Sequence, residues 1–456
     1  MTLDQQHWQD RLTALADKHG VVGASLAIAY GDETAEAAYG VLNRRTHQPA
    51  TTDSVFQIGS ITKVWTATLV MQLVDDGLID LDEPLVTYLP EFRVADAGLT
   101  KCVTTRHLLS HTSGIAGDFF PDTGRGDDCL EKFVALMADL PASHPLGATM
   151  SYCNAGFVVL GRLVEVLRKA TWDQVMRERL LQPLGLEAAG TLPEEALLWG
   201  AATGHLIPPG APEPIVAPQW GLSRNAGPAG LIHARARDLL AFARMHLADG
   251  VAPNGTRILS EESARAMREP QIEVPDRWTF GGHWGLGWIL PDWDGHKVFA
   301  HDGSTIGQGA YLRVLPADPN VAVALLTNGG ESRDLYQDLY GELFEQLAGV
   351  PIPPRVEPLS NPPSYEPEKY VGRYERESMA HEVVVRDDEL VLVNLPSGIL
   401  ATAMGTDRVE GPLIAYETDV FLTSMPSVAG YLPAVFYDAD DGTRYLHVAG
   451  RAAAKV

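Results

Sequence analysis

Gln57-Ile58-Gly59-Ser60-Ile61-Thr62-Lys63 is the stretch around which the chain is organised. A short apolar strand leads into it, and a helical pattern begins at the serine. A serine in the first turn of a helix lies near unpaired N–H groups and the positive end of the helix dipole. Lys63 follows on the same helix face, where a buried amine with a lowered pKa can accept the serine proton. The stretch therefore predicts a nucleophilic Ser60 with Lys63 beside it; the alternative is an N-cap serine followed by a surface lysine.

Length and charge limit the class of protein. With 456 residues, of which 45% are hydrophobic and 21% charged, we expect two or more domains with a sizeable core. The formal net charge of −24 and the lack of a dense Lys/Arg run exclude nucleic acids and anionic membranes as partners. Cys102, Cys129 and Cys153 show no C-x-x-C spacing, so we expect free thiols and no metal site.

The ends and interior of the chain show no targeting signal. The first twenty residues place Trp8, Leu12 and Leu15 at helical spacing, without the continuous apolar stretch of a signal peptide. No stretch is apolar for the eighteen or so residues that a membrane span needs. We therefore expect a cytoplasmic protein.

The pattern of elements predicts an antiparallel sheet interrupted by helices. An apolar hairpin is expected over 21–41, with a turn at Gly31-Asp32, and four strands are expected over 284–290, 297–300, 309–315 and 321–328. The expected helices are 64–76, 157–169, 238–247 and 335–347. This order indicates an α/β domain over 1–350, with its α/β part at 1–65 and 278–350 and a large helical insertion at 66–277.

A proline-rich connector separates this domain from the C-terminal part. Seven prolines fall among the seventeen positions of 351–367, which excludes a helix or a central strand there. Residues 368–456 alternate apolar and polar positions over 382–385, 389–393, 434–437 and 445–448, with turn signals at Asp387-Asp388 and Asp441-Gly442. We expect this part to form a small antiparallel all-β barrel.

Two further stretches complete a motif set with Ser60: Ser151-Tyr152-Cys153-Asn154 and His301-Asp302-Gly303-Ser304. Together they resemble the penicillin-recognising serine hydrolases, the superfamily of serine β-lactamases, DD-peptidases and related esterases. The first stretch matches the Y-x-N element of that superfamily. The second resembles its K-T-G element, with His301 where many members carry lysine.

The resemblance implies roles for these residues. Tyr152 would relay a proton between Ser60 and the leaving group, and the Asn154 amide would hold a substrate carbonyl or Lys63. The alternative is a Tyr and an Asn in a loop that begins a helix.

The strand that carries His301 would run beside the nucleophile. The N–H groups of Ser60 and Ser304 would then form the oxyanion hole, and Gly303 would give the substrate room against the strand. His301 could bind a carboxylate when charged or donate a hydrogen bond when neutral, and a satisfied strand-end histidine is the alternative.

Scaffold stretches of the same superfamily extend the resemblance over residues 10–350. They are 108–114 (LLSHTSG), 227–231 (GPAGL) and 285–288 (GLGW). His111, in the first of them, could be a general base, but its Thr and Ser neighbours favour a hydrogen-bonded turn. The implied fold is the β-lactamase/DD-peptidase-like α/β fold, followed by a lipocalin-like barrel.

The layout of catalytic domain, connector and barrel is similar to that of penicillin-binding-protein-type thioesterases. These stand-alone enzymes release nonribosomal peptides by head-to-tail macrocyclisation through a serine acyl-enzyme. The implied donor is a peptidyl thioester, a carrier protein of a peptide synthetase is a candidate partner, and no cofactor is needed. The same layout resembles intracellular D-aminopeptidases and esterases, and a non-catalytic binding protein is an alternative of another class.

The barrel has two interpretations. It could cover an edge of the catalytic domain, or wall the cleft so that an amine outcompetes water at the acyl-enzyme. Arg451 is a candidate for binding a peptide carbonyl or carboxylate from the barrel; a solvated surface arginine is the alternative. The peptide substrate and the oligomeric state are not predicted.

Overall fold

The computed structural model describes residues 3–208, 213–398, 400–401, 406–425, 428–440 and 442–456. Within these residues, the N-terminal domain is built on an antiparallel sheet of nine strands in the order β3-β2-β1-β15-β14-β13-β10-β9-β8. The central strands are apolar and covered on both faces, as β15 (Val321–Thr327) shows by being buried at every position. The other strands are β1 (Gly23–Tyr30), β2 (Glu33–Asn43), β3 (Gln48–Pro49), β8 (Ile272–Glu273), β9 (His283–Trp284), β10 (Ile289–Leu290), β13 (Phe299–Thr305) and β14 (Gln308–Leu315).

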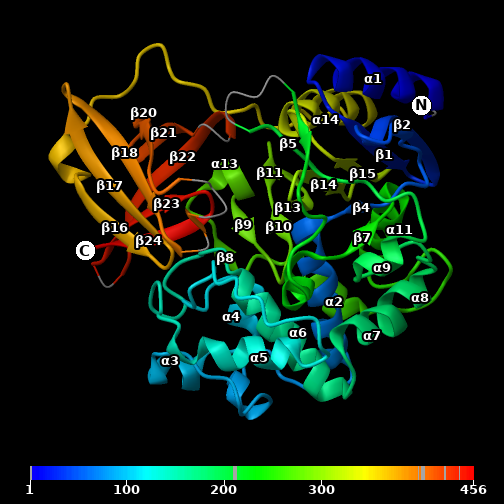
Figure 1. Ribbon diagram of the computed structural model, residues 1–456, viewed down its shortest axis with the longest axis horizontal. Helices are drawn as coiled ribbons and strands as arrows, with labels where there is room; N and C mark the ends of the chain where they lie inside the picture. Colours follow the sequence, from blue (N-terminus) through cyan, green and yellow to red (C-terminus); the bar gives the residue numbers. More distant parts are fainter. Residues whose placement is uncertain (1–2, 209–212, 399, 402–405, 426–427, 441) are drawn as a thin grey trace.

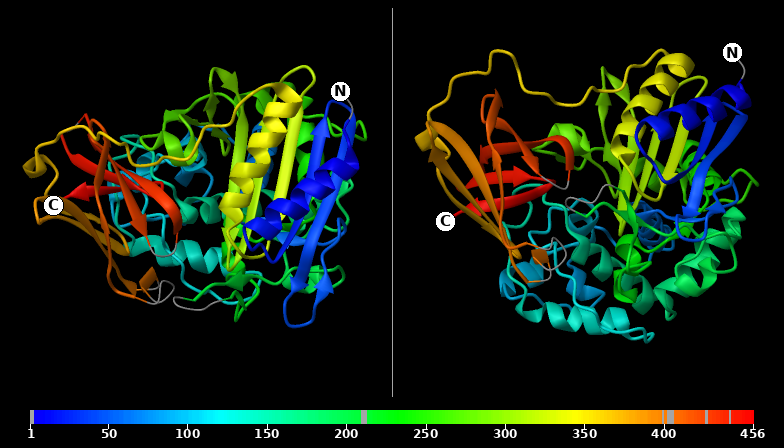
Figure 2. Two further views of the ribbon diagram at one scale, coloured as in Figure 1. Left: turned by 90° about the horizontal axis from the view of Figure 1, so that it is seen from above. Right: turned by 45° about the horizontal axis from the view of Figure 1, so that its top comes forward.

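Helices cover both faces of this sheet. α1 (Gln5–Lys18) and α14 (Ser332–Ala348) lie together on one face, as the left view of Figure 2 shows. α2 (Thr62–Asp75) and α11 (Ala236–Leu247) lie on the other side, where Trp65 stacks on Phe242 with ring centroids 4.6 Å apart. Because α2 is buried along almost its whole length, it forms the centre of the domain and keeps Lys63, in its first turn, away from solvent.

The helical insertion packs below the sheet in Figure 1. Its further helices are α3 (Ala97–Cys102), α4 (Thr105–Leu109), α5 (Cys129–Leu136), α6 (Asn154–Arg168), α7 (Trp172–Met176), α8 (Gln182–Leu184), α9 (Pro193–Ala196), α10 (Gly227–Gly230), α12 (Glu261–Ala266) and α13 (Arg277–Phe280). Three short strand pairs accompany it: β4 (Phe56–Gln57) with β7 (His233–Ala234), β5 (His205–Leu206) with β6 (Ile215–Val216), and β11 (Asp292–Trp293) with β12 (His296–Lys297).

The structure differs from the predicted elements at two strands and at the boundary of the helical insertion. The strand expected over 297–300 is interrupted at Val298, because Lys297 ends the short strand β12 and β13 begins at Phe299 and continues to Thr305. The single strand expected over 284–290 is a hairpin of β9 and β10, because Gly287 turns the chain at φ +92° beside Ala67. The sheet also begins earlier than residue 278, since β8 pairs with β9. In addition, α11 packs against β15 and β1, so this part of the predicted helical insertion covers a face of the sheet.

The connector runs without helix or strand over 351–366, and a 3-10 turn (Pro367–Lys369) then leads into the C-terminal barrel. In the described residues, nine antiparallel strands follow one another in the order β19-β18-β17-β16-β24-β23-β22-β21-β20, and β19 also packs against β21. They are β16 (Gly372–Arg376), β17 (Met379–Arg386), β18 (Glu389–Pro396), β19 (Val409–Pro412), β20 (Ile414–Glu417), β21 (Val420–Met425), β22 (Val428–Asp438), β23 (Arg444–Val448) and β24 (Arg451–Lys455). The barrel is therefore nearly closed, and Figure 1 shows it beside the N-terminal domain.

Two turns of the barrel were predicted from sequence. Asp387 and Asp388 have φ values of +51° and +64° and join β17 to β18 as a two-residue hairpin turn. Of the second turn, Asp441 lies outside the described residues, and Gly442 has φ +81°. The predicted fold class, an α/β antiparallel sheet with a helical insertion plus an all-β barrel, is confirmed by this topology. No helix in the described ranges is long and apolar enough to cross a membrane.

Candidate active site

Ser60 lies in a tight turn between β4 and α2, and strand β13 passes directly beside it. Gly59 has φ +52°, and a Cβ added there would lie 2.5 Å from the backbone nitrogen of Ser304. A Cβ at Gly303 would lie 1.8 Å from the Ile58 carbonyl oxygen and 3.0 Å from the backbone nitrogen of Ser60. Both glycines are therefore required by the close approach of the two backbones. This gives Gly303 a structural reason in addition to the predicted one, which was room for a substrate.

Lys63 is the fully buried partner of Ser60. Its Nζ lies 3.0 Å from Ser60 Oγ and 2.7 Å from the Ala229 carbonyl oxygen. Burial lowers the pKa of the Lys63 ammonium well below its usual value, and the charge of Arg451 lowers it further. A neutral amine in this position can donate one hydrogen to Ala229 and direct its lone pair at the Ser60 hydroxyl.

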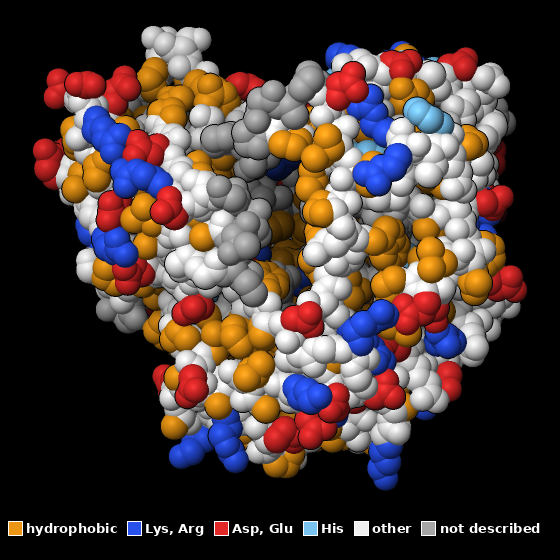
Figure 3. Space-filling model, in the orientation of Figure 1, with side chains coloured by type: hydrophobic (Ala, Val, Ile, Leu, Met, Phe, Trp, Pro, Cys, Tyr) orange, Lys and Arg blue, Asp and Glu red, His pale blue; other side chains and the backbone are white. Residues whose placement is uncertain are grey.

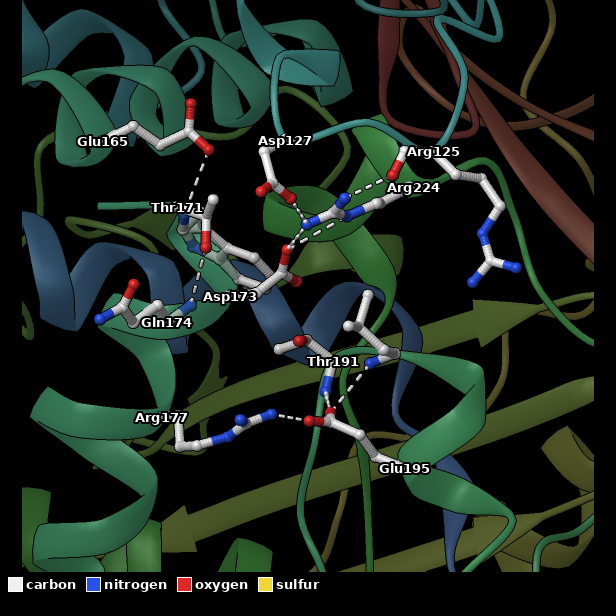
Figure 4. Close-up of polar contacts among 12 residues, drawn as sticks. Arg125, Asp127, Glu165, Thr171, Asp173, Gln174, Arg177, Thr191, Glu195 and Arg224 are labelled. Carbon is white, nitrogen blue, oxygen red and sulfur yellow. Dashed lines mark hydrogen bonds and ion pairs between the residues drawn. The ribbon is translucent and has the colours of Figure 1, made fainter. Parts of the chain in front are cut away.

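Ala229 belongs to α10, and Figure 4 shows the ion pairs that hold the segment just before this helix at Arg224. Thr66 donates a hydrogen bond of 2.8 Å to the adjacent Pro228 carbonyl, so α2 binds two successive carbonyls of α10. Just before α10, the Arg224 guanidinium lies 2.8 Å from Asp127 and 2.9 Å from Asp173. These contacts anchor the segment that carries the acceptor of Lys63.

Tyr152 completes the group around Ser60. Its phenol is hydrogen-bonded to Ser60, and Lys63 Nζ lies 4.8 Å from its ring centroid. Burial raises the pKa of the phenol above its usual value, which keeps it protonated near neutral pH. Asn154 lies two residues later as the first residue of α6 and is half-buried. The structure thus brings Ser60, Lys63 and Tyr152 into contact.

His111 holds the loop of Tyr152 from both sides. Its carbonyl accepts a hydrogen bond of 2.9 Å from the Ser151 N–H, and its Nδ1 accepts one of 3.0 Å from the Cys153 N–H. The His111 and Tyr152 ring centroids are 4.4 Å apart. Burial lowers the pKa of His111 well below its usual value, so it remains a neutral acceptor. This geometry fits the predicted structural role of His111.

His301 lies on β13, buried and uncharged. Burial lowers the pKa of its imidazole to about 3, with the charge of Lys63 acting in the same direction. Its Nδ1 lies 2.6 Å from the Asp302 carbonyl oxygen, while its buried Nε2 has no partner among the described residues. Asp302 turns away and pairs with Arg313 at 2.5 Å. Burial therefore favours the neutral, hydrogen-bonding form of His301 over the charged, carboxylate-binding form.

Arg451 lies against Tyr152. Its side chain is 20% exposed, and its guanidinium lies 4.9 Å from the Tyr152 ring centroid. It pairs with Asp118 at 3.0 Å, and Arg376 pairs with the same carboxylate at 2.7 Å. Burial opposes ionisation of Asp118, but Arg451 and Arg376 hold its pKa below the usual value. The alternative of a solvated surface arginine is therefore wrong.

Sequence reasoning missed Asp118 and Gly450. Asp118 pairs with a guanidinium that is 333 positions away in the chain, and no local motif marks it. Gly450 accepts a hydrogen bond of 2.9 Å from the Tyr152 N–H, again across the two domains. The glycine directly before Arg451 is the one sign of this turn in the sequence.

The surface over the site is hollowed between the barrel and the N-terminal domain, and hydrophobic side chains line part of the hollow (Figure 3). The β5–β6 hairpin lies against the β13–β14 turn three residues after Ser304, through a hydrogen bond of 3.2 Å from the His205 N–H to the Gly307 carbonyl. It exposes Leu206, Ile207 and Ile215. In the described residues, no group of three or more His, Cys, Asp or Glu side chains is arranged to hold a metal ion.

Comparisons with known proteins agree with this geometry. A family model described as "Beta-lactamase" matches residues 8–346. Penicillin-binding protein 4 of Amycolatopsis lactamdurans is 50% identical over 383 residues, which cover 83% of this chain and 100% of that protein. Esterase EstB of Burkholderia gladioli is 31% identical over 374 residues, covering 72% of this chain and 92% of that protein. The crystal structure of SurE superposes with a TM-score of 0.78 at 27% identity, over 99% of each chain, and a second structure holds SurE with D-Leu.

Proposed function

Because the chain belongs to the β-lactamase family of serine hydrolases, we propose that it forms an acyl-enzyme at Ser60 and releases a nonribosomal peptidyl thioester by head-to-tail macrocyclisation. The observation that carries the acyl-enzyme is the separation of 3.0 Å between Ser60 Oγ and the buried Lys63 Nζ. A nucleophile within hydrogen-bond reach of a base with a depressed pKa is the arrangement that acyl transfer needs.

The two pKa shifts divide the proton transfers between Lys63 and Tyr152. Lys63, whose pKa is lowered, accepts the proton of Ser60 as Oγ attacks the thioester carbonyl. The N–H groups of Ser60 and Ser304 bind the oxyanion, and the C–S bond breaks to release the carrier thiol. Tyr152, whose pKa is raised, stays protonated and donates to the departing group. Lys63 passes the proton that it took from Ser60 to Tyr152, which restores both groups. The N-terminal amine of the bound peptide then attacks the acyl-enzyme carbonyl and gives a proton to Lys63. The C–Oγ bond breaks, Tyr152 protonates Ser60 Oγ, and Lys63 reprotonates Tyr152, so that the ring amide is released and the site is restored.

Two observations support an enzyme that releases a peptide over a hydrolase whose substrates carry a free carboxylate. The similarity to SurE covers the barrel as well as the catalytic domain, and one structure of that protein holds D-Leu. Besides Lys63, Arg451 is the one cation that the described residues place beside Tyr152, and Asp118 neutralises it. The exposed apolar side chains of the β5–β6 hairpin support a carrier protein or apolar peptide as partner of this acidic chain.

The test is mass spectrometry of the products formed from a peptidyl N-acetylcysteamine thioester with a C-terminal D-residue and a free N-terminal amine. We expect cyclic product with the parent protein and none with Ser60→Ala. The diastereomer with a C-terminal L-residue and the N-acetylated peptide, which cannot cyclise, are the matched control substrates. Linear acid as the sole product would overturn the macrocyclase.

An intracellular D-aminopeptidase or carboxylesterase is the second candidate, because Esterase EstB of Burkholderia gladioli is similar over 92% of its length. Ser60-dependent turnover of D-amino-acid amides or simple esters, faster than that of the thioester, would establish it. A non-catalytic binding protein is the remaining alternative. It requires that a fluorophosphonate leave Ser60 unlabelled.

The neutral His301 predicts a preference for donors without a free carboxylate. We expect an N-acyl-D-Ala-D-Ala amide to react with a kcat/KM about 10-fold or more above that of the free acid, because an unpaired carboxylate loses hydration in the site. His301→Lys places an ammonium on β13 and is expected to reverse this preference. Steady-state kinetics with both peptides would check it, and a faster reaction of the free acid with the parent protein would contradict it.

A further inference from the structure

The turn between β23 and β24 joins the barrel to the loop of residues 151–153, which carries Tyr152 and is called the catalytic loop below. Ala449 and Gly450 form this turn, with φ values of +50° and +79°. The Tyr152 N–H donates a hydrogen bond of 2.9 Å to the Gly450 carbonyl, and the Ala452 N–H donates one of 3.2 Å to Ser151 Oγ. Two successive residues of the catalytic loop are therefore hydrogen-bonded to the barrel through its backbone.

Close packing makes the position of this turn specific. A Cβ added at Gly450 would lie 2.0 Å from Cε2 of Phe280. The Phe280 ring stacks on Tyr152, with centroids 5.5 Å apart and planes 11° apart. The turn, Phe280 and Tyr152 thus form one packed unit, in which a displacement of the turn would be transmitted to the phenol.

Charges anchor the turn from the side. Arg451 covers the Tyr152 ring, and its guanidinium is tied to Asp118 of the N-terminal domain at 3.0 Å. Arg376 of β16 binds the same carboxylate, so two barrel strands converge on one buried anion. On the opposite side, His111 accepts hydrogen bonds from the N–H groups of Ser151 and Cys153. The Tyr152 loop is therefore held from both domains.

We propose that the β23–β24 turn of the barrel is a positioning element for the acylation step, in which the Gly450 carbonyl and the packing of the turn on Phe280 place the Tyr152 phenol at Ser60. The inference rests on the acyl-enzyme of the proposed function, but not on cyclisation. This role differs from that of a barrel that merely excludes water. Exclusion of water changes whether an amine or water attacks the acyl-enzyme once it has formed. A positioning turn acts on its formation.

The test compares Gly450→Ala with Gly442→Ala in the full chain. Gly442 lies in another barrel turn at φ +81°, where an added Cβ would meet nothing within 4 Å, so it carries the same backbone strain without the contact. The rate of Ser60 labelling by a fluorophosphonate is measured for both. We expect a fall of about 10²-fold for Gly450→Ala, as for the loss of a general acid–base group, and no more than about 2-fold for Gly442→Ala.

A double-mutant cycle separates positioning from general damage. In a Tyr152→Phe background, Gly450→Ala is expected to cost less than about 3-fold, because the phenol through which it acts is already absent. Ser151→Ala, which removes the acceptor of the Ala452 N–H and adds no bulk, is expected to slow labelling about 5- to 10-fold. This milder variant decides the matter where Gly450→Ala unfolds in a thermal melt.

The outcomes are distinct. Wild-type labelling rates in folded Gly450→Ala, or in Ser151→Ala where the former unfolds, would overturn the role of the turn. So would a full effect of Gly450→Ala in the Tyr152→Phe background. A parent protein that is never labelled would overturn the acyl-enzyme itself. Linear in place of cyclic product, with labelling still sensitive to Gly450, would overturn the macrocyclase alone.

Discussion

Ser60→Ala is expected to lower kcat/KM for a peptidyl thioester by about 10⁵- to 10⁶-fold, as loss of a catalytic serine does in other serine hydrolases. The reason is that Lys63 Nζ, 3.0 Å away, then has no hydroxyl to deprotonate, and no acyl-enzyme can form. Intact-mass spectrometry after rapid quenching would show the acyl adduct on the parent protein and none on the variant.

The matched control for this variant is Ser360→Ala, at an exposed serine of the connector. It is expected to form the adduct at the parent rate. Thermal melts should place both variants close to the parent, because the Ser60 side chain makes contacts only within the site. An adduct that persists in Ser60→Ala would place the nucleophile elsewhere.

Lys63→Met is expected to lower the rate of Ser60 acylation by about 10³- to 10⁴-fold. Methionine fills the same buried space without an amine, so the Ser60 proton loses its acceptor while the volume of the core is kept. Stopped-flow measurement of the first turnover with an activated ester would check the value. Lys101→Met, at an exposed lysine of α3, is the control and should acylate normally. Acylation within about 10-fold of the parent would identify Tyr152 as the base.

The same variant should change how stability depends on pH. The folded pKa of Lys63 lies well below its unfolded value, so between the two pKa values the unfolded chain binds more protons than the folded one. The free energy of unfolding contributed by this group therefore rises with pH up to the unfolded pKa of about 10.4. Urea unfolding at several pH values should show that Lys63→Met removes this part of the slope. An unchanged slope would mean that Lys63 is charged in the folded protein.

Local sequence was informative where the function depends on short spacing. Ser60 and Lys63 are three residues apart, with Ser60 in a 3-10 turn (Gly59–Ile61) that runs directly into α2, so their contact follows from local helical spacing once this turn and α2 form. The central strands were also predictable, because β14 and β15 are apolar runs bounded by turn residues. The expected strand over 284–290 was wrong because Gly287 turns the chain against Ala67, a contact with a distant helix.

The charge of His301 and the partner of Arg451 could be determined only from the tertiary structure. Whether His301 is charged depends on burial, which follows from the packing of β13 against the rest of the domain and lowers the pKa to about 3. Arg451 was predicted either to reach the substrate or to face solvent, and the structure pairs it with Asp118 and so removes the second alternative. Neither outcome could be derived from the neighbours of these residues in the chain.

The amino-acid sequence alone therefore determined the proximity of Ser60 and Lys63, the fold class and the division into an α/β domain and a barrel, because these depend on periodicity and on contacts within a few residues. The way in which the barrel enters the active site was decided by the tertiary structure. The hydrogen bond from Tyr152 to Gly450 and the ion pair of Arg451 with Asp118 join residues about 300 or more positions apart. Such pairs form only when two separately folded cores pack together, and no local pattern encodes that packing.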